Sequence, residues 1–458
     1  MKVSIIKENN ITYSSKKEIF QMVENCFKLL ELDKKNIDNL NWNPLGDDLI
    51  KPGNTVLIKP NLVLEENQGG FGEECLYTNC SVVAPVIEYT WKALQKKGKI
   101  ILADAPVQSC NFEKLINSSG YYEMIKKYQE KGLNIELKDL RGLISKYENG
   151  VLVSTTYEKD GIVIDLKQDS EHAKISNIEK VRITNYDPTE LLKHHNKNKH
   201  EYFIAKEALE ADVIINIPKP KAHRKAGVTI GLKNFVGVNV RKEYLPHHKL
   251  GDKKHGGDEY NNSSYFLRLS SKLLDIANKV KSKKHYKTSK ILRIFTRVLS
   301  GIDKKFISKE KNREGSWYGN DTIWRTITDI NKIIQYADKN GKLCKTRQRK
   351  IFNIADMIII GEKEGPLLPS PKYGGIVVAS KDIVCFDEVI ATILGFDIKK
   401  IPLYINVRKT KKYALSDNKE ETIISNNKKW NNKNINNIKK EDTIQIEPSS
   451  GWKNHIEL

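Results

Sequence analysis

The chain of 458 residues is too long for one ordinary hydrophobic core, so its length favours two packed domains. No apolar run reaches the roughly 20 residues that span a bilayer, and the polar start MKVSIIKENN is unlike a signal peptide, so we expect a cytoplasmic protein without a transmembrane segment. The formal charge of +21 accompanies heavy use of Lys, Asn and Ile, which is typical of a compositional bias, so we expect a small anionic partner rather than a nucleic acid.

Residues 1–210 alternate between strand-like and helix-like segments, as expected for an N-terminal α/β domain. Apolar runs predict strands at Lys2–Ile6, Thr55–Lys59, Lys99–Ala103, Ile135–Leu137 and Ile162–Leu166. Apolar residues at helical spacing predict helices at Lys16–Leu32, Ser81–Lys97 and Phe112–Lys131. This alternation favours a largely parallel sheet, whose ligands bind beyond the carboxyl ends of its strands. We therefore expect ligand contacts from Lys59, Asn61 and Asp104, which follow two of the strands.

The segment 211–264 is the most distinctive part of the sequence and is expected to line the cleft. A strand predicted at Asp212–Pro218 leads into the stretch KPKAHRKAGVTIGLKNFVG. Glycine lets a backbone approach a ligand closely, while Lys, Arg and free N–H groups favour phosphate or carboxylate. The ligand-binding residues predicted here are Lys221, Arg224, Gly227, Gly231 and Asn234.

Residues with acid–base chemistry fall in the same segment. Lys233 has apolar neighbours, and burial there would lower its pKa and make it a base or a nucleophile; a structural lysine paired with a carboxylate is the alternative. Imidazole transfers protons near neutral pH or binds metals. We therefore predict catalytic roles for His223, Lys233, His247 and His248, with His248 and Asp258 as ligands of a transition metal.

Two other groups of residues are given plainer roles. No CxxC pair occurs among the six cysteines, so no iron–sulfur motif is encoded and free thiols are expected. The histidines His194, His195 and His200 stand among Lys and Asn residues, and we expect them on a solvated surface.

The pattern of helices and strands begins again after the central segment. Residues 265–320 predict a basic helical insertion, for which a solvated hairpin and a membrane-surface helix pair are the alternatives. Residues 321–407 predict a second α/β domain, where Glu364 either pairs with the basic motif or acts as acid or base. Residues 408–458 read as a polar variable stretch and a C-terminal tail. The sequence thus predicts an α/β protein of two domains with largely parallel sheets, an interdomain cleft and a helical insertion.

Four phrases of the sequence resemble a known family. They are KPNLV at Lys59–Val63, IPKPKAHRKAGVTIGLKNFVG at Ile217–Gly237, EGPLLPSPKYGG at Glu364–Gly375 and ASKDIVCFDEVIATILGF at Ala379–Phe396. Together they are similar to the uncharacterised family named domain of unknown function 362, over roughly Lys51 to Phe396. Many members carry a ferredoxin-like cluster domain, whose cysteines this chain lacks.

The central motif also resembles lactate racemase and its relatives. His223, the Ala226-Gly227 pair, Gly231 and Lys233 follow that family's order at similar spacing, and His248 or His247 lies near its downstream histidine. The resemblance implies a lysine that anchors a nickel-pincer nucleotide, an acid–base histidine and a histidine on nickel.

These patterns leave two principal hypotheses of function. The first is an enzyme of the isomerase, epimerase or oxidoreductase type that moves a proton or hydride on a small carboxylate or phosphate. The second is a non-catalytic binding or assembly protein for a phosphorylated ligand or a metallocofactor. Nucleic-acid binding is disfavoured because basic and aromatic residues are not interleaved. No feature of the sequence indicates the oligomeric state.

Overall fold

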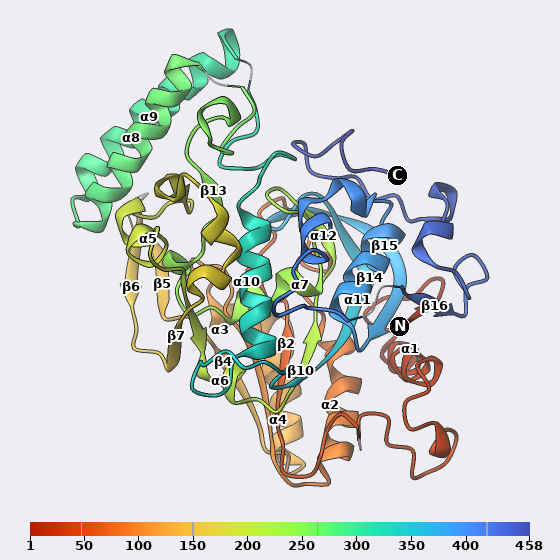
Figure 1. Ribbon diagram of the computed structural model, residues 1–458. Coiled ribbons are helices and arrows are strands. Elements are labelled where there is room, and N and C mark those ends of the chain that lie inside the picture. The colour runs from red at the N-terminus through yellow and green to blue at the C-terminus, as the bar shows by residue number, and fades with distance from the viewer. Residues whose placement is uncertain (47, 149–150, 263, 309, 418–419) are drawn as a thin grey trace.

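A ten-stranded sheet forms the centre of the computed structural model, which describes residues 1–46, 48–148, 151–262, 264–308, 310–417 and 420–458 (Figure 1). Across the sheet the order is β16 (Thr422–Ser425), β1 (Lys2–Lys7), β15 (Leu368–Ser380), β14 (Lys350–Glu364), β10 (Val213–Ile217), β2 (Thr55–Pro60), β3 (Lys99–Asp104) and β4 (Ile135–Asp139). A hairpin of β11 (Lys221–His223) and β12 (Gly227–Thr229) joins the sheet through β14.

The strands from β14 to β4 run parallel, whereas β15 is antiparallel to both of its neighbours. Side chains of the parallel strands alternate between two hydrophobic cores, because successive residues of a strand point to opposite faces. In β2, Leu57 joins one core while Val56 and Ile58 join the other. The sheet is therefore buried on both faces, as parallel sheets usually are.

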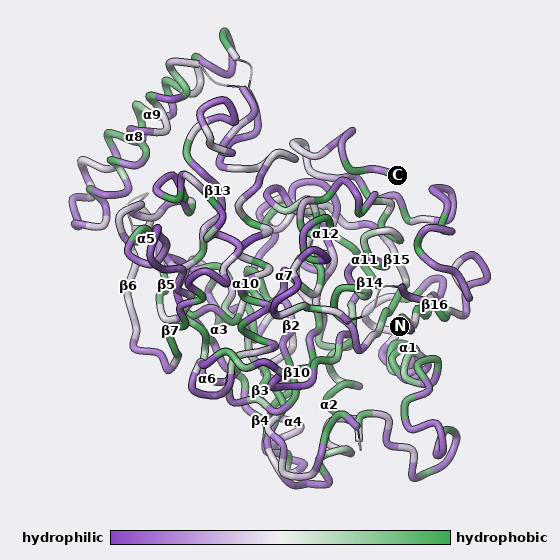
Figure 2. Tube along the Cα trace, viewed as in Figure 1, coloured by the Kyte–Doolittle hydropathy of each residue, from purple (hydrophilic) through white to green (hydrophobic). Residues whose placement is uncertain are grey.

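Helices cover each face of the sheet. One core packs beneath α1 (Lys16–Leu29), α2 (Cys80–Leu94), α3 (Phe112–Ser118) and α4 (Tyr121–Glu130). The other packs beneath α5 (Pro188–His194), α6 (Lys206–Glu210), α7 (Gly231–Asn234), α10 (Ile323–Tyr336), α11 (Ile383–Ile393) and α12 (Pro402–Val407). Figure 2 shows hydrophobic residues concentrated along the strands and the helices against them, while the outer loops are hydrophilic.

Three short two-stranded sheets lie outside the central sheet. They are the pairs β5 (Leu143–Glu148) with β6 (Val151–Thr156), β7 (Gly161–Asp165) with β9 (Glu201–Ala205), and β8 (Val181–Arg182) with β13 (His248–Lys249). The predicted basic insertion contains two helices, α8 (Tyr265–Ser282) and α9 (Tyr286–Phe306), which form a hairpin that stands out from the body (Figure 1). In the described part of the chain, no helix is both long and apolar enough to cross a membrane.

The predicted α/β class with a mostly parallel central sheet is confirmed. The structure differs from the predicted arrangement in that strands of residues 1–210 and 321–407 share one sheet instead of forming two. The reason is that β10 is buried along its whole length and pairs with β2 on one side and β14 on the other.

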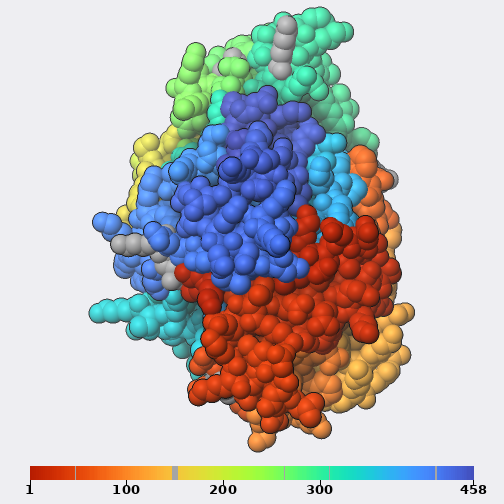
Figure 3. Space-filling model, turned by 90° about the vertical axis from the view of Figure 1, so that its right-hand side faces the viewer, coloured from red at the N-terminus to blue at the C-terminus, as the bar shows by residue number. Residues whose placement is uncertain are grey.

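The polar stretch after residue 407 is more ordered than its composition suggests. It contributes edge strand β16, which runs parallel to β1, and Trp430, which is buried and donates its Nε1–H to the Asp442 carbonyl over 2.8 Å. The first and last parts of the chain accordingly form neighbouring surfaces on one face of the molecule (Figure 3).

Candidate functional site

A cavity of about 110 Å³ opens where strands β2, β3 and β10 end. Ligands of parallel sheets bind at this edge because the carboxyl ends of the strands and the loops that follow them converge there. Six residues predicted from the sequence line it, namely Asn61, Asp104, Lys221, His223, Lys233 and Asn234.

The floor of the cavity is a buried polar cluster centred on Lys59. Its Nζ donates to Asp104 Oδ1 over 2.7 Å and to Asn234 Oδ1 over 3.0 Å. Burial lowers the pKa of Lys59, and the charge of Asp104 opposes that effect. The second oxygen of Asp104 accepts the Leu62 N–H over 2.7 Å. Because these partners already satisfy the carboxylate, we assign Lys59 and Asp104 to holding the site in shape.

Gly237 packs directly against the Lys59–Asp104 pair. Its carbonyl accepts the Ala105 N–H over 2.7 Å, and a Cβ at position 237 would lie 2.1 Å from Asp104 Oδ1. Only glycine therefore lets the segment after α7 approach the Lys59–Asp104 pair.

The wall of the cavity carries three lysines, and none of them is paired with a carboxylate of a described residue. Lys221 donates to Asn61 Oδ1 over 2.7 Å and to the Leu76 carbonyl over 2.6 Å. Lys242 donates to the Ala105 carbonyl over 3.3 Å. Lys233 has no hydrogen bond or ion pair with any residue that the structure describes. An anion would supply the negative charge that these ammonium groups lack.

Burial and mutual repulsion lower the pKa values of all three lysines. Burial, followed by the charge of Lys219, lowers the pKa of Lys221 to about 7. Burial, followed by the charges of Lys242 and Lys225, lowers the pKa of Lys233 to about 7. Burial lowers the pKa of Lys242 to about 8. Near neutral pH these groups can therefore gain or lose a proton when a ligand binds.

His223 is held in one tautomer by the loop that follows it. Its Nδ1 accepts the backbone N–H groups of Lys225 over 3.0 Å and of Ala226 over 3.1 Å. A backbone N–H can only donate, so the proton of the neutral ring must be on Nε2. Burial and, next, the charge of Lys233 hold the pKa of His223 well below its usual range. His223 thus offers the cavity an Nε2–H donor.

His247 has the opposite tautomer. Its Nδ1 lies 2.6 Å from the Leu245 carbonyl oxygen, which can only accept, so Nδ1 carries the proton and Nε2 keeps a lone pair. Burial and the charges of Lys225 and Lys233 hold the pKa of His247 well below its usual range. Two neutral imidazoles, one a donor and one an acceptor at Nε2, therefore share the field of the same lysines.

The structure gives no support for a metal site at the predicted ligands His248 and Asp258 in the described part of the chain. The Asp258 carboxylate accepts the Thr322 hydroxyl over 2.5 Å, the Asp321 N–H over 3.0 Å and the Lys249 N–H. His248 lies in β13, and its buried Nδ1 has no hydrogen-bond partner among the residues that the structure describes. Among the described residues, no group of three or more His, Cys, Asp or Glu side chains could hold a metal ion.

Two predicted residues lie at the surface instead of in the cavity lining. Arg224 Nε is 3.4 Å from Glu364 Oε2, and both side chains are more than a third exposed. Glu364 also accepts the Ser450 N–H over 2.8 Å. This arrangement matches the ion-pairing alternative for Glu364 and links the motif loop to the C-terminal tail.

The two predicted ligand-binding glycines approach protein groups. Gly231 donates its N–H to Asp387 Oδ1 over 2.8 Å at the start of α7. Gly227 has a φ of +79°, and a Cβ there would lie 3.0 Å from the ring of Trp452. The packing of Asp387 and Trp452 thus accounts for both glycines.

Trp452→Ala is expected to destabilise the protein by about 3–5 kcal/mol, because it removes a large buried side chain. The ring is 1% exposed, and its Nε1–H donates to the Arg224 carbonyl over 2.7 Å. Urea unfolding measures the change. The control Trp452→Phe keeps most of the ring but removes the donor, so a smaller loss of about 1–3 kcal/mol is expected. Equal stability of wild type and Trp452→Ala would show that the tail does not hold the loop.

Of the three histidines predicted on a solvated surface, His194 is half-buried, with its Nδ1 2.9 Å from Glu201 Oε2, and the other two are buried. His195 and His200 are buried, and with His172 they form a cluster whose ring centroids lie 5.5–6.2 Å apart. Burial lowers the pKa of His195 to about 3. The Lys and Asn neighbours in the sequence conceal this burial because they point outward while the rings turn inward.

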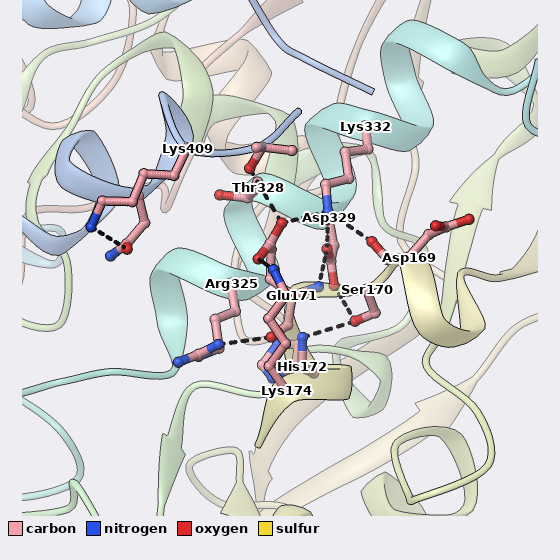
Figure 4. A network of polar contacts seen from close by, with 12 residues as sticks. Asp169, Ser170, Glu171, His172, Lys174, Arg325, Thr328, Asp329, Lys332 and Lys409 are labelled. Carbon is pink, nitrogen blue, oxygen red and sulfur yellow. Dashed lines mark hydrogen bonds and ion pairs between the residues drawn. The ribbon is translucent and has the colours of Figure 1, made fainter. Parts of the chain in front are cut away.

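A buried ionic network anchors His172 to α10 (Figure 4). Lys332 Nζ donates to Glu171 Oε1 over 2.7 Å, and Asp329 accepts the Ser170 hydroxyl over 2.5 Å. The His172 N–H donates to the same hydroxyl over 3.0 Å. Since these contacts join the segment 169–174 to a core helix, we assign the network to stability.

Lys242, Thr229 and Val236 line the cavity but were not predicted. Lys242 comes from the polar stretch NVRKEY, where no local pattern separates an inward lysine from the many surface lysines of this chain. Only the tertiary structure identifies it.

Comparison with known proteins gives a family match over part of the chain. Residues 166–392 match the family described as Domain of unknown function (DUF362). The thylakoid-associated protein sll1697 of Synechocystis sp. is 26% identical over 196 residues, which are 42% of this chain and 42% of that protein. The chain thus matches less than half of the length of this relative, and no solved structure matches it. Lys221, His223 and Lys233 all fall inside the matched residues, and the chain therefore carries a DUF362 domain.

Proposed function

We propose that this protein is an enzyme that binds a small carboxylate or phosphate in the lysine-lined cavity and moves a proton on it, as an isomerase or epimerase does. The observation that carries the proposal is the combination of Lys221 and Lys233, which lack an anionic partner among the described residues, with His223 in the same cavity. Cations select the substrate by its charge, and imidazoles supply proton transfer near neutral pH.

The chemistry assigns a role to each side chain. Lys221 and Lys233 bind the anionic group of the substrate. His247 accepts a proton at Nε2 from the carbon beside a hydroxyl or carbonyl group and returns it to that carbon, while neutral His223 keeps its Nε2 proton and donates a hydrogen bond to the oxygen on which negative charge develops. Burial, followed by the lysine charges, lowers the pKa values of both histidines. A bound anion offsets the second of these effects, so binding makes His247 a stronger base.

The size of the cavity supports a small substrate. Pockets for drug-sized ligands measure roughly 300 Å³ or more, whereas this cavity has about 110 Å³. A pincer nucleotide does not fit that volume, so the proposed mechanism uses only the side chains named above. The six cysteines are unpaired, which supports the reducing cytoplasm as the proposed compartment.

Solvent-proton exchange tests the proposal directly. The protein is incubated in D₂O with a panel of 2-hydroxy acids and small phosphate esters, and mass spectrometry follows deuterium entering carbon-bound positions. Exchange into one class of anion is the expected result. Binding of an anion in calorimetry without exchange into any member would overturn the enzymatic role. That outcome would favour the alternative of a binding or assembly protein, which the strongly lowered pKa values of free His223 and His247 also support.

A further inference from the structure

The helical hairpin α8–α9 exposes many of its large apolar side chains. On α9, six exposed residues share one face, at spacings of three or four residues: Ile291, Ile294, Phe295, Val298, Ile302 and Phe306. We call these six residues the apolar stripe. Phe295 is 57% exposed and Phe306 is 68% exposed, which is unusual for aromatic residues of a helix that packs against a neighbour.

The contact between the two helices explains why the stripe is free. Apart from Leu267, the fully buried residues of both helices are small or polar. The Ser289 hydroxyl donates to the Ala277 carbonyl over 2.9 Å, and the Ser270 hydroxyl donates to the Thr296 carbonyl over 3.0 Å. Amphipathic helices of soluble proteins usually bury their large apolar residues and expose small or polar ones. The apolar stripe of α9 departs from this rule, so burying it requires something outside the described chain.

The hairpin is also strongly basic. Residues 265–306 contain twelve Lys and Arg and only two acidic residues, Asp275 and Asp303. Asp275 is paired with Arg182 over 3.0 Å, and Asp303 is fully buried. Of the exposed cations on α9, Arg297 and Lys304 lie between stripe residues along the helix, and Lys287 lies about one turn before Ile291. An exposed apolar face bordered by Lys and Arg matches a surface that is apolar inside and negatively charged outside.

The body of the protein holds the hairpin in a fixed position. Lys281 Nζ donates to the Asn185 carbonyl over 2.8 Å, and the Ser271 hydroxyl donates to Glu259 Oε1 over 2.7 Å. In Figure 1 the pair projects beyond the rest of the chain, and Figure 2 shows hydrophobic and hydrophilic residues alternating along both helices. A rigid projecting element can reach a flat surface without obstruction by the body.

We propose that the α8–α9 hairpin docks the protein on an anionic lipid bilayer, with the apolar stripe inserted at the level of the headgroups and the basic residues against the lipid charges. The hairpin lies on the membrane and does not cross it. This interaction is independent of the cavity, so it stands whether or not the proposed enzymatic function does.

Vesicle co-sedimentation of the full chain tests the proposal. The probe is vesicles of phosphatidylcholine containing about 30% phosphatidylglycerol, compared with phosphatidylcholine alone, at low and at physiological salt. Binding to the anionic vesicles that weakens with salt, and at least about tenfold weaker binding to the neutral vesicles, is expected. No binding to anionic vesicles, or equal binding to both kinds, would overturn the proposal.

Paired variants locate the contact. Replacing Ile294, Phe295 and Val298 with Ser is expected to weaken vesicle binding at least about tenfold without lowering thermal stability, because these side chains are exposed. Leu40→Ser is the matched control, since Leu40 is 97% exposed and lies far from the hairpin in sequence. The pair Arg297→Glu and Lys304→Glu is expected to weaken binding similarly, while Lys126→Glu on α4 leaves it unchanged. Undiminished binding by the Ser variant would show that another surface carries it.

A second copy of the chain is the other occupant that could bury the stripe. Light scattering after size-exclusion chromatography distinguishes it from lipid. A monomer that binds anionic vesicles supports the proposal. A dimer that the Ser substitutions dissociate, combined with no vesicle binding, would replace it with self-association.

Discussion

His223→Asn is expected to lower the rate of solvent-proton exchange by about 10²–10³-fold, the usual contribution of one preorganised hydrogen-bond donor to a developing oxyanion. Asparagine places Oδ1 where His223 has Nδ1, so the backbone N–H groups of Lys225 and Ala226 keep their acceptor. What the variant loses is the proton at Nε2. Thermal stability and binding of sulfate in calorimetry should therefore stay close to wild type while exchange is lost.

His223→Gln provides the complementary control. Its amide reaches the position of Nε2 but leaves both backbone N–H groups without an acceptor, which costs about 1–3 kcal/mol for each buried group. This variant is expected to be less stable than His223→Asn in urea unfolding. If His223→Asn exchanged protons as fast as wild type, His223 would have only a structural role.

The same reasoning applies to His247, where the backbone group is an acceptor. The Nδ2–H of Asn in His247→Asn can donate to the Leu245 carbonyl in place of the histidine Nδ1–H. The variant loses only the Nε2 lone pair. If both Asn variants lost exchange but still bound the anion, the Nε2–H of His223 and the Nε2 lone pair of His247 would both be required for catalysis.

The sequence predicts the local elements of this fold well because they depend on local patterns. The apolar run of β2 and the helical spacing of α2 act over a few residues and give nearly the observed bounds. Strand pairing is different, because it depends on contacts between distant segments. The register of β1 against β15 places Ser4 opposite Ala379, and no local periodicity indicates that partner.

The same distinction applies to the site. The sequence predicts Lys59, Asn61 and Asp104 as residues of the site because they lie at the ends of parallel strands. Residues at these positions come together at one edge of a parallel sheet, whatever the packing of its individual side chains. The tautomers of His223 and His247 were not predictable, since they depend on which backbone groups the folded loop presents to each ring. The sequence predicts ligand contacts for the glycines of the motif. At Gly227, however, the ring of Trp452, which is 225 residues later in the chain, occupies the space where a Cβ would lie.

The double variant Lys221→Met and Lys233→Met is expected to reduce sulfate affinity at least about hundredfold, because each charge-assisted hydrogen bond contributes about 1.5–3 kcal/mol. Methionine has a side chain of similar length to lysine but carries no charge. The thermal stability of the double variant is expected to be equal to or higher than that of wild type, because buried ammonium groups oppose folding. Isothermal calorimetry and thermal unfolding measure the two effects, with Lys126→Met on α4 as an exposed control.

The pH dependence of binding gives a second, independent signature. The pKa values of Lys221 and Lys233 are about 7 without ligand, and a bound anion raises them toward the ordinary lysine value. Anion affinity is therefore highest below pH 7 and falls as pH rises above it, with protons taken up on binding in that window. Sulfate keeps its charge across this range, so any proton uptake comes from the protein. Affinity that does not change with pH, or a double variant that binds sulfate as wild type does, would remove these lysines from the site. If the double variant lost sulfate affinity and proton uptake but kept its stability, Lys221 and Lys233 would serve to bind the anion and would not be needed to stabilise the fold.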